Sequence, residues 1–297
     1  MIHSSFSANS APEGGGGAID NFVGRMTVSL STFSGNNSSS AFGGGVLNDG
    51  SLTLSQSTLS GNSSIAGGGA IENQAQLSVT DSAFLGNRSI AGGGIEGTFG
   101  SLNIVNSTFS ANTSIYGAAI ENLGATMTIT SSTLSANRSY TGEGGGIQNA
   151  GPSLTSLKST ILAGNLGGGC AGLIADAGYN IADDATCKLN AIGSVNNGDP
   201  QLSSAGVQDN GGPTPTIALE SGSPAIDVIP LAACTNQASP PGRITTDQRG
   251  FRRPDHHETV CDIGAYESRP SSQAFGSAGA AGQSALRLDR KDAPAGG

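Results

Sequence analysis

The stretch GGAIENQAQLSVTDSAFLGN, residues 68–87, contains three kinds of segment that recur along the chain. Small residues lead to an apolar one at Ile71, apolar and polar residues then alternate around Leu77 and Val79, and Phe84 stands three positions before Asn87. Alternation with a period of two is typical of a β-strand. We therefore interpret the stretch as three short β segments joined by turns rich in Gly, Ser and Asn.

The same three segments return about every 25 residues, which makes each repeat one supersecondary unit of a solenoid. Parallel β crossovers are overwhelmingly right-handed. The sequence therefore predicts an all-β fold, a right-handed single-stranded parallel β-helix of about seven coils of about 25 residues, with an irregular, disulfide-containing C-terminal cap.

Stacked coils place equivalent residues in columns, roughly 4.8 Å apart. We expect the repeated asparagines to form a structural ladder of hydrogen-bonded amides. Its members are Asn9, Asn36, Asn62, Asn87, Asn112, Asn137 and Asn165. One inward column is expected at Phe6, Phe33, Leu59, Phe84, Phe109, Leu134 and Ile161, and another at Ile19, Leu47, Ile71, Ile95, Ile120 and Ile147.

Three regions follow from the fading of the repeat: coils at 1–166, a continuation with a capping region at 167–267, and a disordered Ala/Gly/Ser-rich tail at 268–297. All four cysteines, Cys170, Cys187, Cys234 and Cys261, lie in the second region. Of the three pairings that four cysteines allow, Cys170 with Cys187 and Cys234 with Cys261 is the simplest. No CxxC spacing points to zinc.

Composition restricts the partners. A net charge of -9 with only 13 Lys and Arg residues gives no basic patch for nucleic acid. No run approaches the ~20 apolar residues of a membrane span. Paired cysteines indicate an extracellular or cell-surface location, yet no export signal is recognisable. Because Met1 begins inside a coil, we expect the signal and further coils to precede it, and a monomer unless that uncapped coil pairs.

Two resemblances add expectations. The repeats GG-[AV]-[IL], as at 68–71, and FxxN, as at 84–87, resemble those of polymorphic outer membrane proteins, a family implicated in adhesion. The segments CAGLIADAGYNIADDATC (170–187), GDPQL (198–202), DNGGPTPTIAL (209–219), SGSPAIDV (221–228), TDQRGFRRP (246–254) and CDIGAYE (261–267) resemble bacterial β-helix proteins with a choice-of-anchor Q region. The resemblance implies a pectin lyase-like fold and a surface or secreted location, with no established reaction.

A candidate binding row directly follows the inward Ile column, at Glu72, Glu96 and Glu121, flanked by Asp20, Asn48 and Gln148. Strand alternation predicts that these side chains point outward. Stacked carboxylates could hold a cation such as calcium or a basic partner, or could form a solubilising face. Apart from such calcium, we expect no cofactor and no resident metal.

Other polar sets have plain and functional interpretations. A hydroxyl row, Thr32, Thr58, Thr108, Thr133 and Thr160 with Ser34, Ser60, Ser110 and Ser135, suits ice binding or ordinary cross-strand contacts. The charge cluster Asp247, Arg249, Arg252, Arg253, Asp255, Asp262 and Glu267, beside His256 and His257, suits acid–base chemistry or Asp–Arg pairs that hold a loop. Asp183 and Asp184 are interpreted as turn residues.

The favoured function is a non-catalytic secreted or cell-surface scaffold for adhesion, or for surface binding of carbohydrate or protein. The alternative is a polysaccharide lyase or glycoside hydrolase, because parallel β-helices often carry these activities. Against it, the coils resemble one another, whereas an active site requires departures from a repeat.

Overall fold

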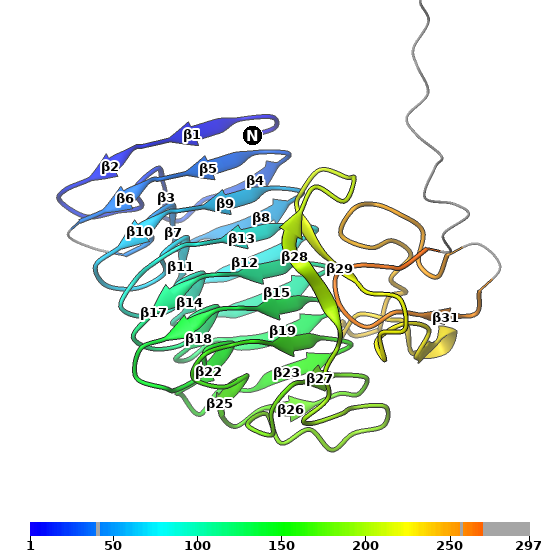
Figure 1. Ribbon diagram of the computed structural model, residues 1–297. Coiled ribbons are helices and arrows are strands. Elements are labelled where there is room, and N and C mark those ends of the chain that lie inside the picture. The colour runs from blue at the N-terminus through cyan, green and yellow to red at the C-terminus, as the bar shows by residue number, and fades with distance from the viewer. Residues whose placement is uncertain (40–41, 256–257, 270–297) are drawn as a thin grey trace, which may run out of the picture.

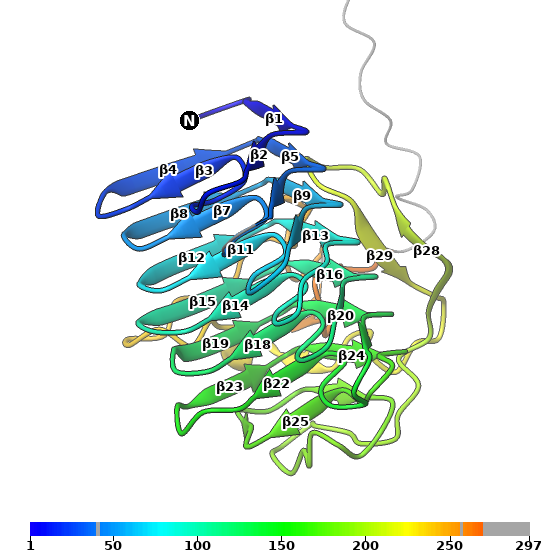
Figure 2. The same ribbon diagram turned by 90° about the vertical axis from the view of Figure 1, so that its left-hand side faces the viewer.

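The computed structural model describes residues 1–39, 42–255 and 258–269. They form a solenoid in which parallel strands of successive coils lie in file (Figures 1 and 2). The prediction of an all-β parallel solenoid with about seven coils is confirmed. The only helical element in the described part is the 3-10 segment η1, Leu231–Ala233, so no helix there could cross a membrane.

Three long sheets form the walls. Sheet A consists of β4 (Arg25–Ser29), β8 (Ser51–Ser55), β12 (Gln76–Thr80), β15 (Ser101–Val105), β19 (Thr126–Thr130), β23 (Thr155–Lys158) and β26 (Ala175–Asp176). Sheet B consists of β1 (Ser5–Ser7), β5 (Thr32–Ser34), β9 (Thr58–Ser60), β13 (Ala83–Leu85), β16 (Thr108–Ser110), β20 (Thr133–Ser135), β24 (Ile161–Ala163) and β27 (Ile181–Ala182). Sheet D consists of β3 (Ile19–Asn21), β7 (Val46–Asn48), β11 (Ile71–Asn73), β14 (Ile95–Gly97), β18 (Ile120–Asn122), β22 (Ile147–Asn149) and β25 (Cys170–Gly172).

A fourth, short segment per coil was not predicted. It lies between sheets B and D and is named sheet C. Its strands are β2 (Ser10–Ala11), β6 (Asn37–Ser38), β10 (Ser63–Ser64), β17 (Thr113–Ser114) and β21 (Arg138–Ser139), and Arg88 bridges Ser63 and Thr113. These strands are too short to show a period of two, so alternation could not reveal them.

The core is built from the predicted columns, with two corrections of register. Phe84 stacks on Phe109 with ring centroids 4.4 Å apart, and both side chains are fully buried. In β7, Val46 and not Leu47 pairs with Ile71 of β11. In β24, Leu162 and not Ile161 pairs with Leu134 of β20. Each predicted position was wrong by one residue, and in a strand such a slip moves a side chain to the other face.

The asparagine ladder lies in single file as predicted. The Nδ2 of Asn62 donates to Oδ1 of Asn87 at 2.9 Å and to the carbonyl of Phe33 at 3.0 Å. Its Oδ1 accepts from the backbone N–H and from Nδ2 of Asn36. The side-chain amide therefore uses both donors and both acceptor positions. The residue before it, Gly61, has φ +61°, the left-handed turn that glycine adopts readily.

Two further ladders were missed by the sequence analysis. Asn21, Asn48 and Asn73 are the last residues of their sheet D strands and bond in file, as do Asn122 and Asn149, with Gly97 interrupting the series. A serine ladder runs through Ser31, Ser57, Ser82, Ser107 and Ser132, where each Oγ accepts the backbone N–H of the serine one coil before. Both series are visible in the sequence at the repeat period.

The region after the coils has two parts. Cys187 and Leu189 belong to the main core and close the last coil, and the Cys170–Cys187 disulfide ties this closure to β25. Residues 202–255 and 258–269 instead return along the side of the solenoid, as the yellow and orange ribbon of Figure 1 shows. Their strands are β28 (Leu202–Gln208), β29 (Thr216–Leu219), β30 (Ile229–Pro230) and β31 (Val260–Cys261). We call this part the side segment. The Cys234–Cys261 disulfide lies within it, so the predicted pairing is confirmed.

The side segment is hydrogen-bonded to several coils at the corner between sheets A and B. Asn106 Nδ2 donates to the carbonyl of Thr246, and Gln237 Nε2 donates to the carbonyl of Ile129. The predicted tail lies, from residue 270 onward, outside the described residues.

Candidate functional site

The acidic row is in register but is not a surface. Glu72 pairs with Glu96, and Glu96 with Glu121. All three are buried: Glu72 is 1% exposed, Glu96 6% and Glu121 4%. The turns that follow sheet C cover them: a Cβ placed on Gly67 would lie 1.6 Å from Oε2 of Glu96. The side chains leave the core as alternation predicts, but the expectation that the row faces solvent was wrong, because alternation does not show whether the outer side is open.

Burial changes the acid–base state of the row. Desolvation, reinforced by Glu96, raises the pKa of Glu72 to about 9, and burial raises the pKa of Glu121 to about 7. The pKa of Glu96 is raised by the same cause. If the row were ionised, one carboxylate oxygen on each of the three residues would have no hydrogen-bond donor, whereas a proton retained on Glu72 lets it donate to Glu96.

In the part of the chain that the structure describes, no three His, Cys, Asp or Glu side chains are arranged to hold a metal ion. The Glu row is also tightly packed. The calcium expectation thus finds no built site among these residues.

The hydroxyl row is covered in the later coils, whereas Thr32 remains exposed and Thr58 half-buried. Thr108, Thr133 and Thr160 are buried, Thr108 Oγ1 donates to Oε1 of Gln248 at 2.6 Å, and Thr133 Oγ1 accepts the backbone N–H of Ala265. The side segment therefore covers the later coils of the flat array that ice binding would need.

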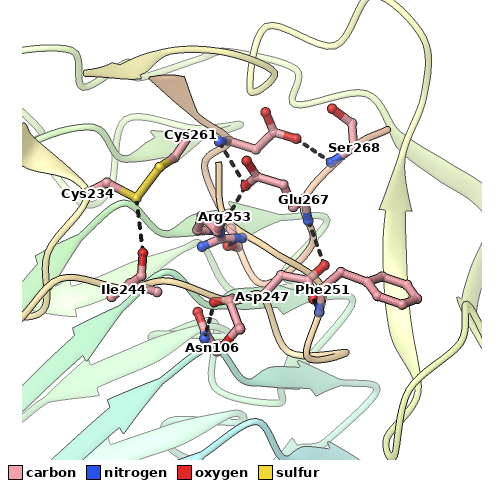
Figure 3. Close-up of polar contacts among 12 residues, drawn as sticks. Asn106, Cys234, Ile244, Asp247, Phe251, Arg253, Cys261, Glu267 and Ser268 are labelled. Carbon is pink, nitrogen blue, oxygen red and sulfur yellow. Dashed lines mark hydrogen bonds and ion pairs between the residues drawn. A yellow bond between two sulfur atoms is a disulfide. The ribbon is translucent and has the colours of Figure 1, made fainter. Parts of the chain in front are cut away.

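The charge cluster holds the side segment together. Asp247 and Arg249 form an ion pair at 2.6 Å, Arg253 and Glu267 another at 2.8 Å, and all four side chains are buried. Figure 3 shows Arg253 beneath Glu267, near the Cys234–Cys261 disulfide. The loop-holding interpretation therefore fits the geometry. His256 and His257 lie outside the described residues.

The paired aspartates likewise hold turns. Asp183 Oδ2 accepts the backbone N–H of Gly164, and Asp184 accepts those of Gly169 and Thr186. The interpretation as turn residues agrees with these bonds.

A groove that the sequence analysis missed lies over sheet C. It has a volume of about 390 Å³. Its signal is the tetrapeptide after each ladder asparagine: NSSI (62–65), NRSI (87–90), NTSI (112–115) and NRSY (137–140). The serine at the third position of each tetrapeptide is buried, whereas the last residues form an exposed file, namely Ile65 (55%), Ile90 (45%), Ile115 (36%) and Tyr140 (56%). We call this surface the isoleucine groove.

Of two exposed arginines near the groove, Arg88 lines it and Arg138 lies beside the lining residue Tyr140. Arg88 and Arg138 stand two coils apart in the column that also contains Ser63 and Thr113, a separation of roughly 10 Å at ~4.8 Å per coil. The guanidinium carbon of Arg138 lies 5.0 Å from the ring centroid of Tyr140. Among the described residues, neither arginine is in an ion pair. The groove therefore combines an apolar floor with cations free to bind an anion.

No family model, no curated protein and no solved structure matches this chain.

Proposed function

We propose that this chain is a non-catalytic surface-binding scaffold, and that the isoleucine groove binds an extended acidic polysaccharide. The observation that carries the proposal is the exposed file Ile65, Ile90, Ile115 and Tyr140 with Arg88 and Arg138 beside it.

A repeating ligand suits this surface. A polymer that lies along the solenoid axis meets an equivalent position every ~4.8 Å. Isoleucine side chains can contact the C–H faces of sugars, Tyr140 can stack on a ring, and the polar side chains of Asn37 and Ser63 can bond to hydroxyls.

A peptide strand suits it less well. Ser63 is paired with Asn37 on one side and with Arg88 on the other, so the backbone beneath the groove already has its parallel neighbours. Strand addition requires an unpaired edge. The groove offers side chains only.

Charge supports an acidic ligand. The chain has a net charge of -9, and the two groove arginines are among its 13 basic residues. Guanidinium groups bind carboxylates through two parallel hydrogen bonds. A polyanion repelled by the rest of the surface would thus be held at the groove, with an affinity that falls as salt rises.

The two disulfides support an oxidising compartment. The resemblance of the repeats to polymorphic outer membrane proteins, and of the C-terminal region to choice-of-anchor Q proteins, supports a location at a bacterial surface. The lyase or hydrolase alternative has weaker support, because the adjacent Asp183 and Asp184 are engaged with turn backbone.

The test is binding to immobilised polygalacturonate and alginate, with neutral dextran as the reference polymer. We expect R88Q/R138Q to weaken binding about tenfold, since each exposed charge pair contributes up to ~1 kcal/mol. The matched control is R25Q/R243Q, which removes two exposed arginines outside the groove. Equal weakening by both variants, or equal binding of dextran, would contradict the proposal.

A further inference from the structure

We infer that the buried file Glu72, Glu96 and Glu121 acts as a proton-holding column beneath the isoleucine groove: its protons keep the groove turns closed, and their loss in alkali loosens them. The link to ligand binding rests on the proposed function, whereas the response of the turns does not.

The same turns connect the two features. Ile65 and Gly67 belong to one turn, Ile90 and Gly92 to the next, and the isoleucine of each faces the groove. A Cβ on Gly67 would come within 2.5 Å of Oε2 of Glu72 and still closer to Glu96, so the turn backbone rests directly on the carboxyl groups. A hydrogen bond joins the backbone of Gly92 to Glu121. Any expansion of the column must therefore move the turns.

Neutral carboxyl groups fit this space, whereas charged ones do not. Ionised neighbours one coil apart, at ~4.8 Å, would repel one another in a medium of low polarity. Each would also have a buried oxygen without a donor. Such groups take up protons instead of remaining charged.

Within the described part of the chain, no cation forms an ion pair with the file. Asp49 acts on Glu72 from the turn after β7, and Thr98 Oγ1 donates to Glu72 Oε1 at 2.5 Å from the turn after β14. At the ends of the file, Glu72 pairs with Leu47 and Glu121 with Gln148, whose Nε2 donates to Glu143. Arg88 and Arg138 are exposed on the outer side of the turns. Protons are thus the neutralising partner that the packing admits.

The direction of the pH effect follows. In the folded chain, the pKa of Glu72 is raised from 4.5 to about 9 by burial and by Glu96. Between these values the folded state holds more protons than the unfolded state, so stability falls as pH rises. The contribution is complete below pH 4.5 and is lost towards pH 9.

The first measurement is thermal unfolding of the whole chain between pH 5 and pH 9. We expect the wild-type Tm to fall by about 5 °C or more over this range. In E72Q/E96Q, which keeps the shape and removes two of the three titrating carboxyl groups, the fall should be clearly smaller. Glu121 and Glu267, whose pKa values are raised to about 7 and about 8, still titrate in this variant. The control E13Q/E220Q, with two exposed glutamates replaced, should behave like wild type. The same pH dependence in E72Q/E96Q as in wild type would overturn the inference.

The second measurement reads the turns without a ligand. Trypsin cleavage after Arg88 and Arg138, relative to cleavage after the exposed Arg243, should rise between pH 7 and pH 9 in wild type and rise less in E72Q/E96Q, where only Glu121 of the column still titrates. A flat ratio in wild type would overturn the inference.

Calcium and polysaccharide complete the design. Calcium is added at about 1 mM, the range in which weak extracellular calcium sites bind. If it raised the Tm of wild type at pH 8 but not the Tm of E72Q/E96Q, a cation would be neutralising the column, and the inference would fail. Polysaccharide binding should weaken from pH 6 to pH 9 more in wild type than in E72Q/E96Q. Absence of binding at both pH values would contradict the proposed function. The Tm and trypsin results would still test the proton-holding column in that case.

Discussion

The coils and the side segment of this chain are stabilised in opposite ways. In the coils, each polar or aromatic side chain contacts its own copy one turn away: Asn62 bonds to Asn87, and Phe84 stacks on Phe109. In the side segment, contacts join unlike residues and occur once, as with Arg253 and Glu267. Because the contacts in the coils repeat, the sequence shows which residues are partners there. In the side segment, only the three-dimensional structure shows which residues are partners.

The largest effect should come from breaking a contact that occurs once. Arg253 is 1% exposed, pairs with Glu267 at 2.8 Å and donates to the carbonyl of Gly264. Arg253→Ala leaves a buried carboxylate without its partner, which costs about 3–5 kcal/mol. Urea unfolding followed by circular dichroism measures this loss.

The control is Arg252→Ala, which changes the exposed neighbour. We expect it to stay within about 0.5 kcal/mol of wild type. Trypsin should cut the side segment of the Arg253 variant while the coils remain resistant. Simultaneous loss of both regions would show that they are not stabilised separately.

A smaller effect is expected from one rung of the ladder. Asn87→Ala removes donations to Asn112 and to the carbonyl of Leu59, and strands the backbone N–H of Asn62. The expected loss of unfolding free energy is about 2–4 kcal/mol, since buried partners lose their hydrogen bonds. Asn103→Ala, at an exposed asparagine of sheet A, should cost about 0.5 kcal/mol or less. Equal costs in urea unfolding would contradict the ladder's role.

The smallest effect is a gain. Gly97 interrupts the second asparagine series between Asn73 and Asn122, and its Cβ position is 3.3 Å from Ala125 and 3.5 Å from Oδ1 of Asn122. Gly97→Asn should complete the file and raise the unfolding free energy by about 0.5–1.5 kcal/mol, with a slight shift of Ala125. Gly97→Ala is the control, because it restricts the backbone without adding the amide. A gain no larger than that of the control would show that the amide adds nothing.

The fold was predictable from sequence because its signals are local and repeated. The repeat of about 25 residues predicted the length of a coil, and the asparagines at that spacing, from Asn36 to Asn165, predicted the hydrogen-bonded ladder. Two predicted positions, Leu47 and Ile161, were wrong by one residue. Each lies beside a second branched aliphatic residue, Val46 or Leu162, that occupies the inward position instead.

The candidate site was harder to predict. Glu72 sits where alternation predicts an outward side chain, yet its burial depends on a turn several residues earlier, at Gly67. The isoleucine groove has a sequence signal in NSSI and its copies, but a two-residue strand has no period that would show which of its neighbours are exposed. Nothing in the sequence predicts the hydrogen bond between Thr108 and Gln248, because the two residues are far apart in the chain and their contact does not repeat.

The stacking register is tested most directly by cross-linking. Thr53, Ser78 and Asn103 occupy one outward column of sheet A, in successive coils. Among the described residues all cysteines are already paired, so a new disulfide would report only the introduced thiols. Neighbouring positions at ~4.8 Å lie within the Cα separation that a disulfide spans, and positions two coils apart, at roughly 10 Å, do not. The account predicts that mild oxidation cross-links T53C/S78C and leaves T53C/N103C reduced; cross-linking of T53C/N103C, or none in T53C/S78C, would contradict it.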